Sequence, residues 1–294
     1  MRLDLWTALL LSAPILGCTG AVSDPASAGD AETSTTTSAV VIVERAVGSS
    51  GGAARADRAE TSARFVRVLA PSSTRDALRI IGASLDLPAR ASCASIAGLA
   101  SGVAPAAGPA PVVELLDVGA VSLETNGSET RLVPRQLPDV TDVVSGVVYA
   151  RSADPILFPA GSRYVVRVSG GPEVDPFEVS AAAPADPTDV KASGDEGPAG
   201  LVVPAGSAVE LTWPAEATDD VLYVDVQPAA FRCTLEDGLG AAGDRTRASV
   251  PAALIDDAGT LVVHRVHREA LVARGLESGE LRFDFSRAIP YTRR

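Results

Sequence analysis

Lysine, histidine and aromatic residues are scarce in this chain of 294 residues. Lys191 is the only lysine, two residues are histidine, and aromatic side chains make up 4% of the sequence, while the formal net charge is −12. A nucleic-acid-binding protein needs a basic stripe that displaces counterions from phosphates, and the sequence has none. The same deficit argues against attraction to an anionic membrane surface by charge alone. We therefore expect no nucleic-acid partner.

The sequence also lacks the spacings of a catalytic or metal centre. His264 and His267 are the only histidines, and strand alternation around them sends their side chains to opposite faces. The run "GLGAAG", residues 238–243, matches a dinucleotide fingerprint, but "DRTRASVP" after it cannot begin the long helix that would receive a pyrophosphate. Acidic doublets at 219–220 and 256–257 are typical of turn caps. We predict no catalytic residue, no metal ligand and no cofactor.

The N-terminal residues have the pattern of a targeting segment. Residues 5–16 form an apolar stretch, and twelve helical residues rise only about 18 Å, too little for a hydrocarbon core of about 30 Å. "ILGC", Ile15 to Cys18, resembles the bacterial lipobox, in which an aliphatic residue, a spacer and Gly or Ala precede an obligatory Cys. That resemblance implies removal of a signal peptide, residues 1–17, and acylation of Cys18, which would attach the protein to membrane lipid.

Two further points concern this attachment. Thr19 follows the cysteine where Asp would favour inner-membrane retention, so the pattern favours the outer membrane of a bacterial cell envelope. The alternative is an ordinary secreted protein whose signal peptide ends near a cysteine.

Residues 18–63 are rich in Ser, Thr, Ala, Gly and Asp. Such a segment buries too little apolar surface to offset its backbone entropy, so we predict a flexible, disordered tether. One piece interrupts it, because "AVVIVERAV", residues 39–47, is β-branched enough to form a strand that docks on the first domain.

The rest of the chain predicts a mainly β protein with two β-sandwich-like domains and one short helix. In residues 64–183, "VSLETNGSETRLV" places Asn126-Gly127 between two alternating runs, which is typical of a type I′ hairpin. "SSTRDALRIIGASL" predicts the helix, with Ser73 or Thr74 as N-cap and a core stripe of Ala77, Leu78, Ile80 and Ile81. In residues 184–294, short alternating strands predict an immunoglobulin-like or fibronectin-like sandwich.

Several of these segments resemble a known group of proteins. They include "FVRVLAPSSTRDALRIIGASLDLPARASC", "LPDVTDVVSGVVYA", "RYVVRVSGG", "VELTW" and "RCTLEDG". They are similar to the uncharacterised lipoproteins that are abundant in myxobacteria, over residues 65–287. The resemblance implies a Gram-negative envelope and assigns no functional residue.

Cys93 and Cys233 are the two cysteines outside the N-terminal segment. In an oxidising envelope compartment they could pair, which would close a loop of 140 residues and stabilise the fold by about 5 kcal/mol on the chain-entropy model. The alternative is two buried free thiols.

Three functional interpretations follow. The first is a lipid-anchored, non-catalytic envelope protein with a structural or interaction role, whose partner is an envelope protein or polysaccharide. The second is a carbohydrate- or peptide-binding module, which predicts a concave aromatic platform that would draw on Trp213, Tyr149, Tyr164 or Tyr223. The third is an envelope hydrolase, which predicts a pocket where a histidine meets a carboxylate and a hydroxyl.

Overall fold

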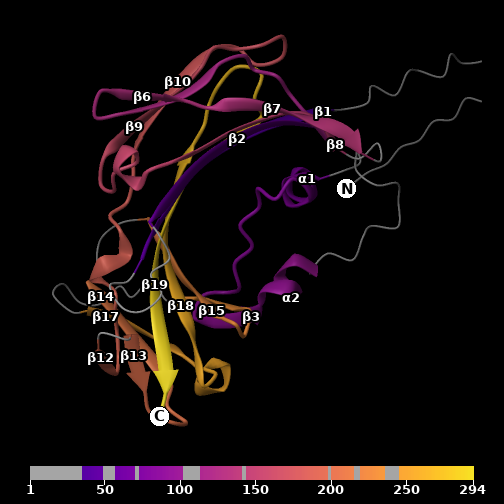
Figure 1. Cartoon of the computed structure of the whole chain (residues 1–294). Coiled ribbons are helices and arrows are strands. Elements are labelled where there is room, and N and C mark those ends of the chain that lie inside the picture. Colours follow the sequence, from indigo (N-terminus) through magenta and orange to yellow (C-terminus); the bar gives the residue numbers. More distant parts are fainter. Residues whose placement is uncertain are drawn as a thin grey trace, which may run out of the picture. The chain divides into compact units, whose positions relative to one another are not determined.

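Strands make up most of the described part of the chain in the computed structural model (Figure 1). The structure describes residues 35–48, 57–69, 73–101, 113–140, 144–197, 200–214, 219–235 and 245–294. Residues 34–294 cluster as one compact unit. The expected signal peptide, Cys18 and the "GLGAAG" run lie outside the described residues.

The strands of the first half are β1 (Thr35–Val47), β2 (Arg58–Leu69), β3 (Ser92–Ser95), β4 (Val113–Leu115), β5 (Val121–Thr125), β6 (Ser128–Arg131), β7 (Val133–Val140), β8 (Val144–Ala153), β9 (Arg163–Val168) and β10 (Phe177–Ala182). Those of the second half are β11 (Lys191–Ala192), β12 (Asp195–Gly197), β13 (Gly200–Val203), β14 (Val209–Pro214), β15 (Val221–Gln227), β16 (Phe231–Thr234), β17 (Arg245–Val250), β18 (Ala258–Ala270) and β19 (Ser278–Arg293). The helices are α1 (Thr74–Ile80), α2 (Ile96–Ser101) and the 3₁₀ turns η1 (Pro155–Leu157), η2 (Pro187–Asp189) and η3 (Ala252–Leu254).

One large sheet of twelve strands connects the molecule, in the order β3-β16-β15-β18-β19-β1-β2-β4-β8-β7, with β13 and then β12 added beside β19. A four-stranded sheet, β10-β9-β5-β6, and a three-stranded sheet, β11-β14-β17, complete the fold. Each small sheet shares a hydrophobic core with the large one. The prediction of a mainly β protein built from β-sandwiches is therefore confirmed.

The first core lies between the four-stranded sheet and the strands β1, β2 and β19. Tyr164, Val166 and Val168 point into it from β9, as the alternation of that segment predicts. The predicted hairpin is present, because Asn126 and Gly127 connect β5 to β6 with φ values of +50° and +75°. Positive φ at both central residues is the requirement of a type I′ turn.

The second core has the strand order of an immunoglobulin domain. Strands β11, β14 and β17 correspond to A, B and E in one sheet, while β16, β15, β18 and β19 correspond to C′, C, F and G in the other. The expected apolar face of β14, made by Val209, Leu211 and Trp213, is buried between them. This confirms the immunoglobulin-like prediction for the C-terminal half.

The hairpin of β18 and β19 belongs to both cores. Leu281, Phe283 and Phe285 on β19 lie in the first core, whereas Ile289 and Tyr291 on the same strand lie in the second. Residues on both sides of the expected boundary at 183 and 184 therefore contribute to the first core, and strands from both sides form the large sheet.

The prediction for residues 18–63 needs a correction. The strand expected at 39–47 is present and extends over Thr35–Val47, but it lies in the interior of the sheet, parallel to β19 and antiparallel to β2. Residues 58–63 belong to β2 rather than to a tether. Two of its buried residues, Ala59 and Ala63, are small, so this part of β2 lacks the large apolar side chains that predict a strand.

Helix α1 is present where the sequence predicts it. Ser73 is its N-cap and accepts a hydrogen bond from the Asp76 backbone N–H. Ala77 is buried, but Ile80 is 42% exposed, so its assignment to the core stripe was wrong because the helix ends there. Helix α2 was not predicted; it begins after Ser95, whose hydroxyl accepts from the Gly98 N–H. Neither described α-helix is long and apolar enough to cross a bilayer.

Candidate functional site

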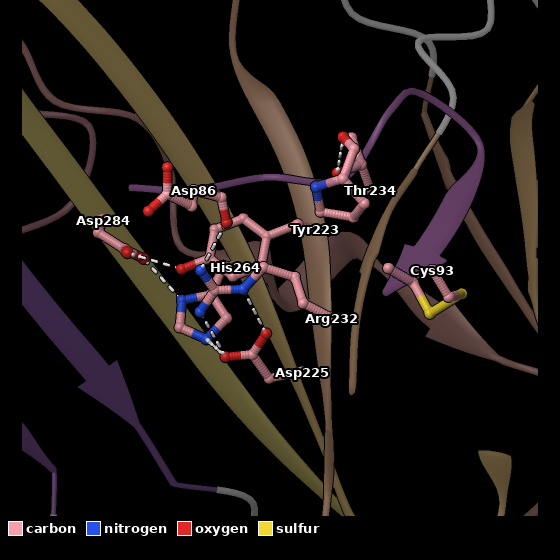
Figure 2. Close-up of polar contacts among 10 residues, drawn as sticks. Asp86, Cys93, Tyr223, Asp225, Arg232, Thr234, His264 and Asp284 are labelled. Atoms are coloured by element: carbon pink, nitrogen blue, oxygen red, sulfur yellow. Dashed lines mark hydrogen bonds and ion pairs between the residues drawn. A yellow bond between two sulfur atoms is a disulfide. The ribbon is translucent and has the colours of Figure 1, made fainter. Parts of the chain in front are cut away.

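A polar cluster covers the face of the large sheet that points away from both cores. Tyr223 and Asp225 reach it from β15, Arg232 from β16, His264 from β18 and Asp284 from β19 (Figure 2). Because successive strand residues alternate between faces, apolar neighbours such as Val224 and Val263 enter the core while these polar groups point outward. Tyr223 and His264 lie directly opposite each other in the register of β15 and β18.

His264 is held between two carboxylates. Its Nδ1 lies 2.7 Å from Asp284 Oδ1, and its Nε2 lies 3.9 Å from Asp225 Oδ2. The Tyr223 hydroxyl donates to Asp284 Oδ2 at 2.9 Å, and the Tyr223 ring stacks on the imidazole with 4.3 Å between ring centroids. Asp284 therefore accepts from both rings of the stacked pair.

Arg232 closes the other end of this cluster. Its Nε and Nη2 donate to the two oxygens of Asp225 at 2.7 and 2.8 Å, a bidentate geometry. Its guanidinium carbon also lies 4.5 Å from the Tyr223 ring centroid, within cation–π range.

The surroundings of Asp284 and Tyr223 determine their protonation states at neutral pH. Burial of Asp284 acts to raise its pKa, but His264 and the hydrogen bonds from His264 and Tyr223 outweigh burial, so the pKa of Asp284 lies below its ordinary value. Burial, together with the charge of Asp284, raises the pKa of Tyr223 well above its ordinary value. Tyr223 is thus a neutral donor and Asp284 a charged acceptor at neutral pH.

A segment that we call the strap, residues 81–92, crosses this face of the sheet from α1 to β3 (Figures 1 and 2). Arg282 Nη2 donates to the Ala83 carbonyl at 2.8 Å, Arg232 Nη1 to the Asp86 carbonyl at 3.2 Å, and Thr234 Oγ1 to the Pro88 carbonyl at 3.1 Å. Three side chains of the sheet therefore hold the backbone of the strap.

The two ends of the strap are fixed as well. The Asp86 carboxylate accepts two hydrogen bonds from Arg79 of α1, at 2.9 Å each, and these bonds lower the pKa of Asp86 although burial opposes the shift. Beyond the strap, Cys93 on β3 lies opposite Cys233 on β16, and a disulfide joins them with 4.0 Å between their Cα atoms.

Two adjoining cavities, of about 280 and 410 Å³, lie on this face of the sheet, and we call them together the groove. The strap lines only the smaller one. Both are lined by Glu44, His264 and Asp284. The smaller also contacts Glu60, Ser62 and Arg64 of β2 and the strap residues Ser84 and Leu85, and the larger contacts Arg58, Ala46 and Gln227. Ligand sites of proteins are commonly concave pockets of several hundred cubic ångströms, so the groove is the candidate site.

The side chains of this cluster are held by hydrogen bonds to one another and form a polar lining of the groove. The histidine and the carboxylate of a catalytic triad are present, but the hydroxyl belongs to Tyr223, which donates to the carboxylate and stacks on the imidazole instead of presenting its oxygen to it. In the ranges that the structure describes, no group of His, Cys, Asp and Glu side chains could hold a metal ion. The groove can bind a polar ligand through charges and hydrogen bonds.

The structure places the histidines as the alternation predicts, on opposite faces of β18. His264 faces the groove, while His267 Nδ1 lies 2.8 Å from Asp220 Oδ1 on the other side. Asp220 therefore pairs with a histidine, rather than only capping a turn as the sequence suggested. At the second doublet, the carbonyl of Asp257 accepts from the Arg293 N–H.

The aromatic platform expected for a carbohydrate-binding module is not formed by the residues proposed for it. Trp213, Tyr149, Tyr164 and Tyr223 are each 5% exposed or less. They pack within the cores or under the strap, and none presents a ring face for stacking on a sugar.

The sequence analysis did not predict the groove, because alternation shows that Arg282, Asp284 and Ser286 share one face of β19 but does not show what covers that face. Arg282 and Ser286 are only 6% and 8% exposed. One signal was available in the sequence. The strands β15, β18 and β19 each have an apolar face, and their other face carries Tyr, His, Arg or Asp. Rings and charges together on one sheet face are typical of a polar cluster rather than of a surface that contacts only water. Their partners come from distant parts of the chain, so periodicity alone could not bring them together.

The fold and the groove define a β-sandwich protein with a polar site on one face of its large sheet. No protein-family model and no curated protein matches the chain. Among solved structures, it is similar to the mouse nectin-like molecule 4 ectodomain, with 10% identity and a TM-score of 0.21, over 87% of this chain and 64% of that one.

It is also similar to an ICAM-5 D1–D4 ectodomain fragment, with 14% identity and a TM-score of 0.18, over 84% of this chain and 53% of that one. The Fcho1 Mu homology domain of Danio rerio with bound Eps15 peptide has 12% identity and a TM-score of 0.23, over 88% of this chain and 97% of that one. The chain spans less than two thirds of the two ectodomain structures. At these TM-scores the similarities carry no conclusion about function.

Proposed function

We propose that this protein is a lipid-anchored, non-catalytic binding protein of the bacterial cell envelope, and that the groove is its binding site. The observation that carries the binding role is the groove itself, two adjoining cavities lined by charged side chains on one face of the sheet, the smaller of them beside the strap. The wall is preorganised, because disulfide, ion-pair and backbone contacts fix the strap and the polar cluster before any ligand arrives.

The non-catalytic role rests on the geometry around His264. A hydrolase that acts through a nucleophile needs the hydroxyl or thiol beside the base. Here Asp284 and Asp225 are the polar partners found beside the two ring nitrogens, and the disulfide removes the thiols of Cys93 and Cys233.

The proposed anchor rests on the "ILGC" spacing and on Cys18. One acyl chain gives marginal membrane binding, whereas two or three chains attach a protein stably. Metabolic labelling with palmitate tests this proposal: we expect label on the wild-type protein and none on Cys18→Ala. Unlabelled wild-type protein that fractionates away from membranes would contradict the anchor and leave the binding role standing.

The binding role is tested with detergent-solubilised full-length protein and a pool of small peptides and saccharides released by digestion of isolated cell envelopes. Ala46 lines the larger cavity, so Ala46→Trp should fill it, and Ala182→Trp, at an exposed position of β10, is the matched control. We expect the wild type and Ala182→Trp to retain components of the pool and Ala46→Trp to lose them. Equal retention by all three proteins, or no retention by the wild type, would contradict a binding role for the groove.

A further inference from the structure

The smaller cavity contains charged side chains that have no ion-pair partner. Glu44, Glu60 and Arg64 all line it. No described carboxylate lies within 4 Å of the Arg64 guanidinium, and no described basic group lies within 4 Å of Glu44 or Glu60, although the three residues interact at longer range. The only hydrogen bond of Arg64 in the described part of the chain is from Nη1 to Ser62 Oγ, at 3.0 Å.

The other charged groups that line the smaller cavity are paired. Asp284 pairs with His264, Asp225 with Arg232, and Arg282 with Glu280 at 3.3 Å. Charged groups that are partly removed from water are stable only when they are compensated. An unpaired cation and unpaired carboxylates in one cavity therefore fit a ligand that supplies the missing charges.

The strand register sorts these charges into two rows. Glu60 lies opposite Glu44 across β2 and β1, and Glu44 lies opposite Asp284 across β1 and β19, so three carboxylates occupy one row. Like charges directly opposite each other destabilise a sheet. A cationic group placed over this row would relieve that repulsion.

The adjacent row on the same face is cationic. Ser62 lies opposite Ile42, which lies opposite Arg282. Arg64 belongs to the next row along β2, but its hydrogen bond to Ser62 directs the guanidinium towards this row, where the charge of Arg282 acts on it. Rows that are two residues apart along a strand are separated by about 7 Å.

These distances select the length of a ligand that carries both charges. A dipeptide in extended conformation spans about 7 Å from end to end. Its free ammonium and carboxylate groups can therefore reach the acidic and the basic row together, and a cavity of about 280 Å³ beside a second of about 410 Å³ leaves room for its side chains.

We propose that the groove binds short zwitterionic peptides of dipeptide length, with the peptide ammonium group against Glu44 and Glu60 and the peptide carboxylate against Arg64. This proposal rests on the proposed binding role of the groove and specifies its ligand. The pKa of Glu44 agrees with it, because burial and the neighbouring charges of Asp284 and Glu60 raise this pKa and outweigh the charges of Arg282 and Arg58, which lower it.

The test is calorimetric titration of full-length protein in detergent with alanyl-alanine. N-acetyl-alanyl-alanine lacks the ammonium charge, and alanyl-alanine amide lacks the carboxylate. We expect saturable binding of the free dipeptide and at least tenfold weaker binding of each blocked form, because each loses a charged hydrogen bond.

Variants of the protein make the assignment specific. Glu44→Gln should weaken binding of alanyl-alanine at least tenfold, and Arg64→Gln should do the same. Glu277→Gln and Arg151→Gln, at exposed positions of the turn before β19 and of β8, are matched controls and should bind as the wild type does. Glu44→Gln should leave the thermal midpoint of the free protein unchanged or raise it, because it removes a repelling charge, and a residue with only a structural role would lower it.

Each outcome decides the proposal. Binding that either blocked dipeptide or either groove variant leaves unchanged would overturn it, because the terminal charges would not be recognised. If alanyl-alanine does not bind while Ala46→Trp still abolishes retention of envelope components, the ligand class is wrong and the binding role stands. If the groove retains nothing at all, both proposals fail.

Discussion

Asp284 is the central hydrogen-bond acceptor of the polar cluster on the outward face of the large sheet. It accepts from His264 and from Tyr223, and it lies at the point where the two cavities meet. Removing one partner of a buried charged network lowers the free energy of unfolding, because the remaining groups lose a hydrogen bond or counter-charge that water cannot replace. The site is therefore stiff at its centre, while its unpaired charges lie at its β2 side.

We expect Asp284→Asn to lower the free energy of unfolding by about 3 kcal/mol, because Tyr223 and His264 lose a charged acceptor. Urea denaturation measures the change, and Asp219→Asn, at an exposed position, should stay within about 0.5 kcal/mol of the wild type.

The effect of Asp284→Asn should also depend on pH. The pKa of Asp284 is depressed in the folded protein. Its contribution is therefore complete above the unfolded pKa of about 4 and is lost as the pH falls through the lower folded value. The difference between wild type and variant should shrink below about pH 4, and a difference that stays constant down to pH 2 would contradict this assignment.

At the scale of elements, two glycines with positive φ would be destabilised by substitution for different physical reasons. Gly127 in the β5–β6 turn has a φ of +75° and open space where a Cβ would lie. Gly146 on β8 has a φ of +117°, and a Cβ there would lie 1.9 Å from the Leu115 carbonyl oxygen on β4, with which β8 pairs. The first position therefore carries backbone strain alone and the second also carries a clash with the sheet.

We expect Gly127→Ala to cost about 1 kcal/mol of unfolding free energy, the usual price of a left-handed conformation for an L-residue. Gly146→Ala should cost more than about 3 kcal/mol, because β4 and β8 must separate to admit the methyl group. Chemical denaturation of both variants measures the difference. Equal losses would show that β4 can move away from β8 at little cost.

The strap is the element whose position depends on a covalent bond. The disulfide follows it directly and closes a loop of 140 residues. Replacing both cysteines by serine should lower the unfolding free energy by up to about 5 kcal/mol on the chain-entropy model. Amide hydrogen exchange of residues 81–92 should rise with it; exchange that stays at the wild-type rate would show that the hydrogen bonds to Arg282, Arg232 and Thr234 hold the strap alone.

Local signals in the sequence were sufficient for several elements. The Asn126-Gly127 turn, the Ser73 cap and the alternation of β9 and β14 each depend on neighbouring residues, so they could be predicted. The interior position of β1 could not, because its partners on β19 are 240 residues away. The same is true of the site: the residues of the polar cluster are unremarkable one by one, and it is the register of four strands that brings them together.

For the whole molecule, the two cores share the hairpin of β18 and β19, so we expect them to unfold together with a single free energy of unfolding. All four tyrosines of the chain lie inside this structure, each 1% exposed or less. Burial raises the pKa of every one of them, that of Tyr149 to about 12. A tyrosine with a raised folded pKa stabilises the fold below its unfolded pKa of about 10, and that stability is lost as the pH rises through the folded value.

We therefore expect an ultraviolet titration of the folded protein to show no tyrosine ionisation near pH 10. Ionisation should begin above about pH 11, together with loss of far-ultraviolet circular dichroism, because the rings ionise when the fold opens. The same titration in concentrated urea, where a midpoint near pH 10 is expected, is the control. A reversible midpoint near pH 10 in folded protein would show that at least one ring is accessible to hydroxide.

The pairing of β1 with β19 has a consequence for biogenesis. A polypeptide leaves the ribosome, or an export channel, with its N-terminal part first. Val41 and Val43 then emerge long before Leu281 and Phe283, the partners that lie opposite them in the finished sheet. Neither core can close until residues 278–293 have been synthesised, because β19 contributes side chains to both. The apolar residues of β1 therefore stay exposed until the chain is almost complete.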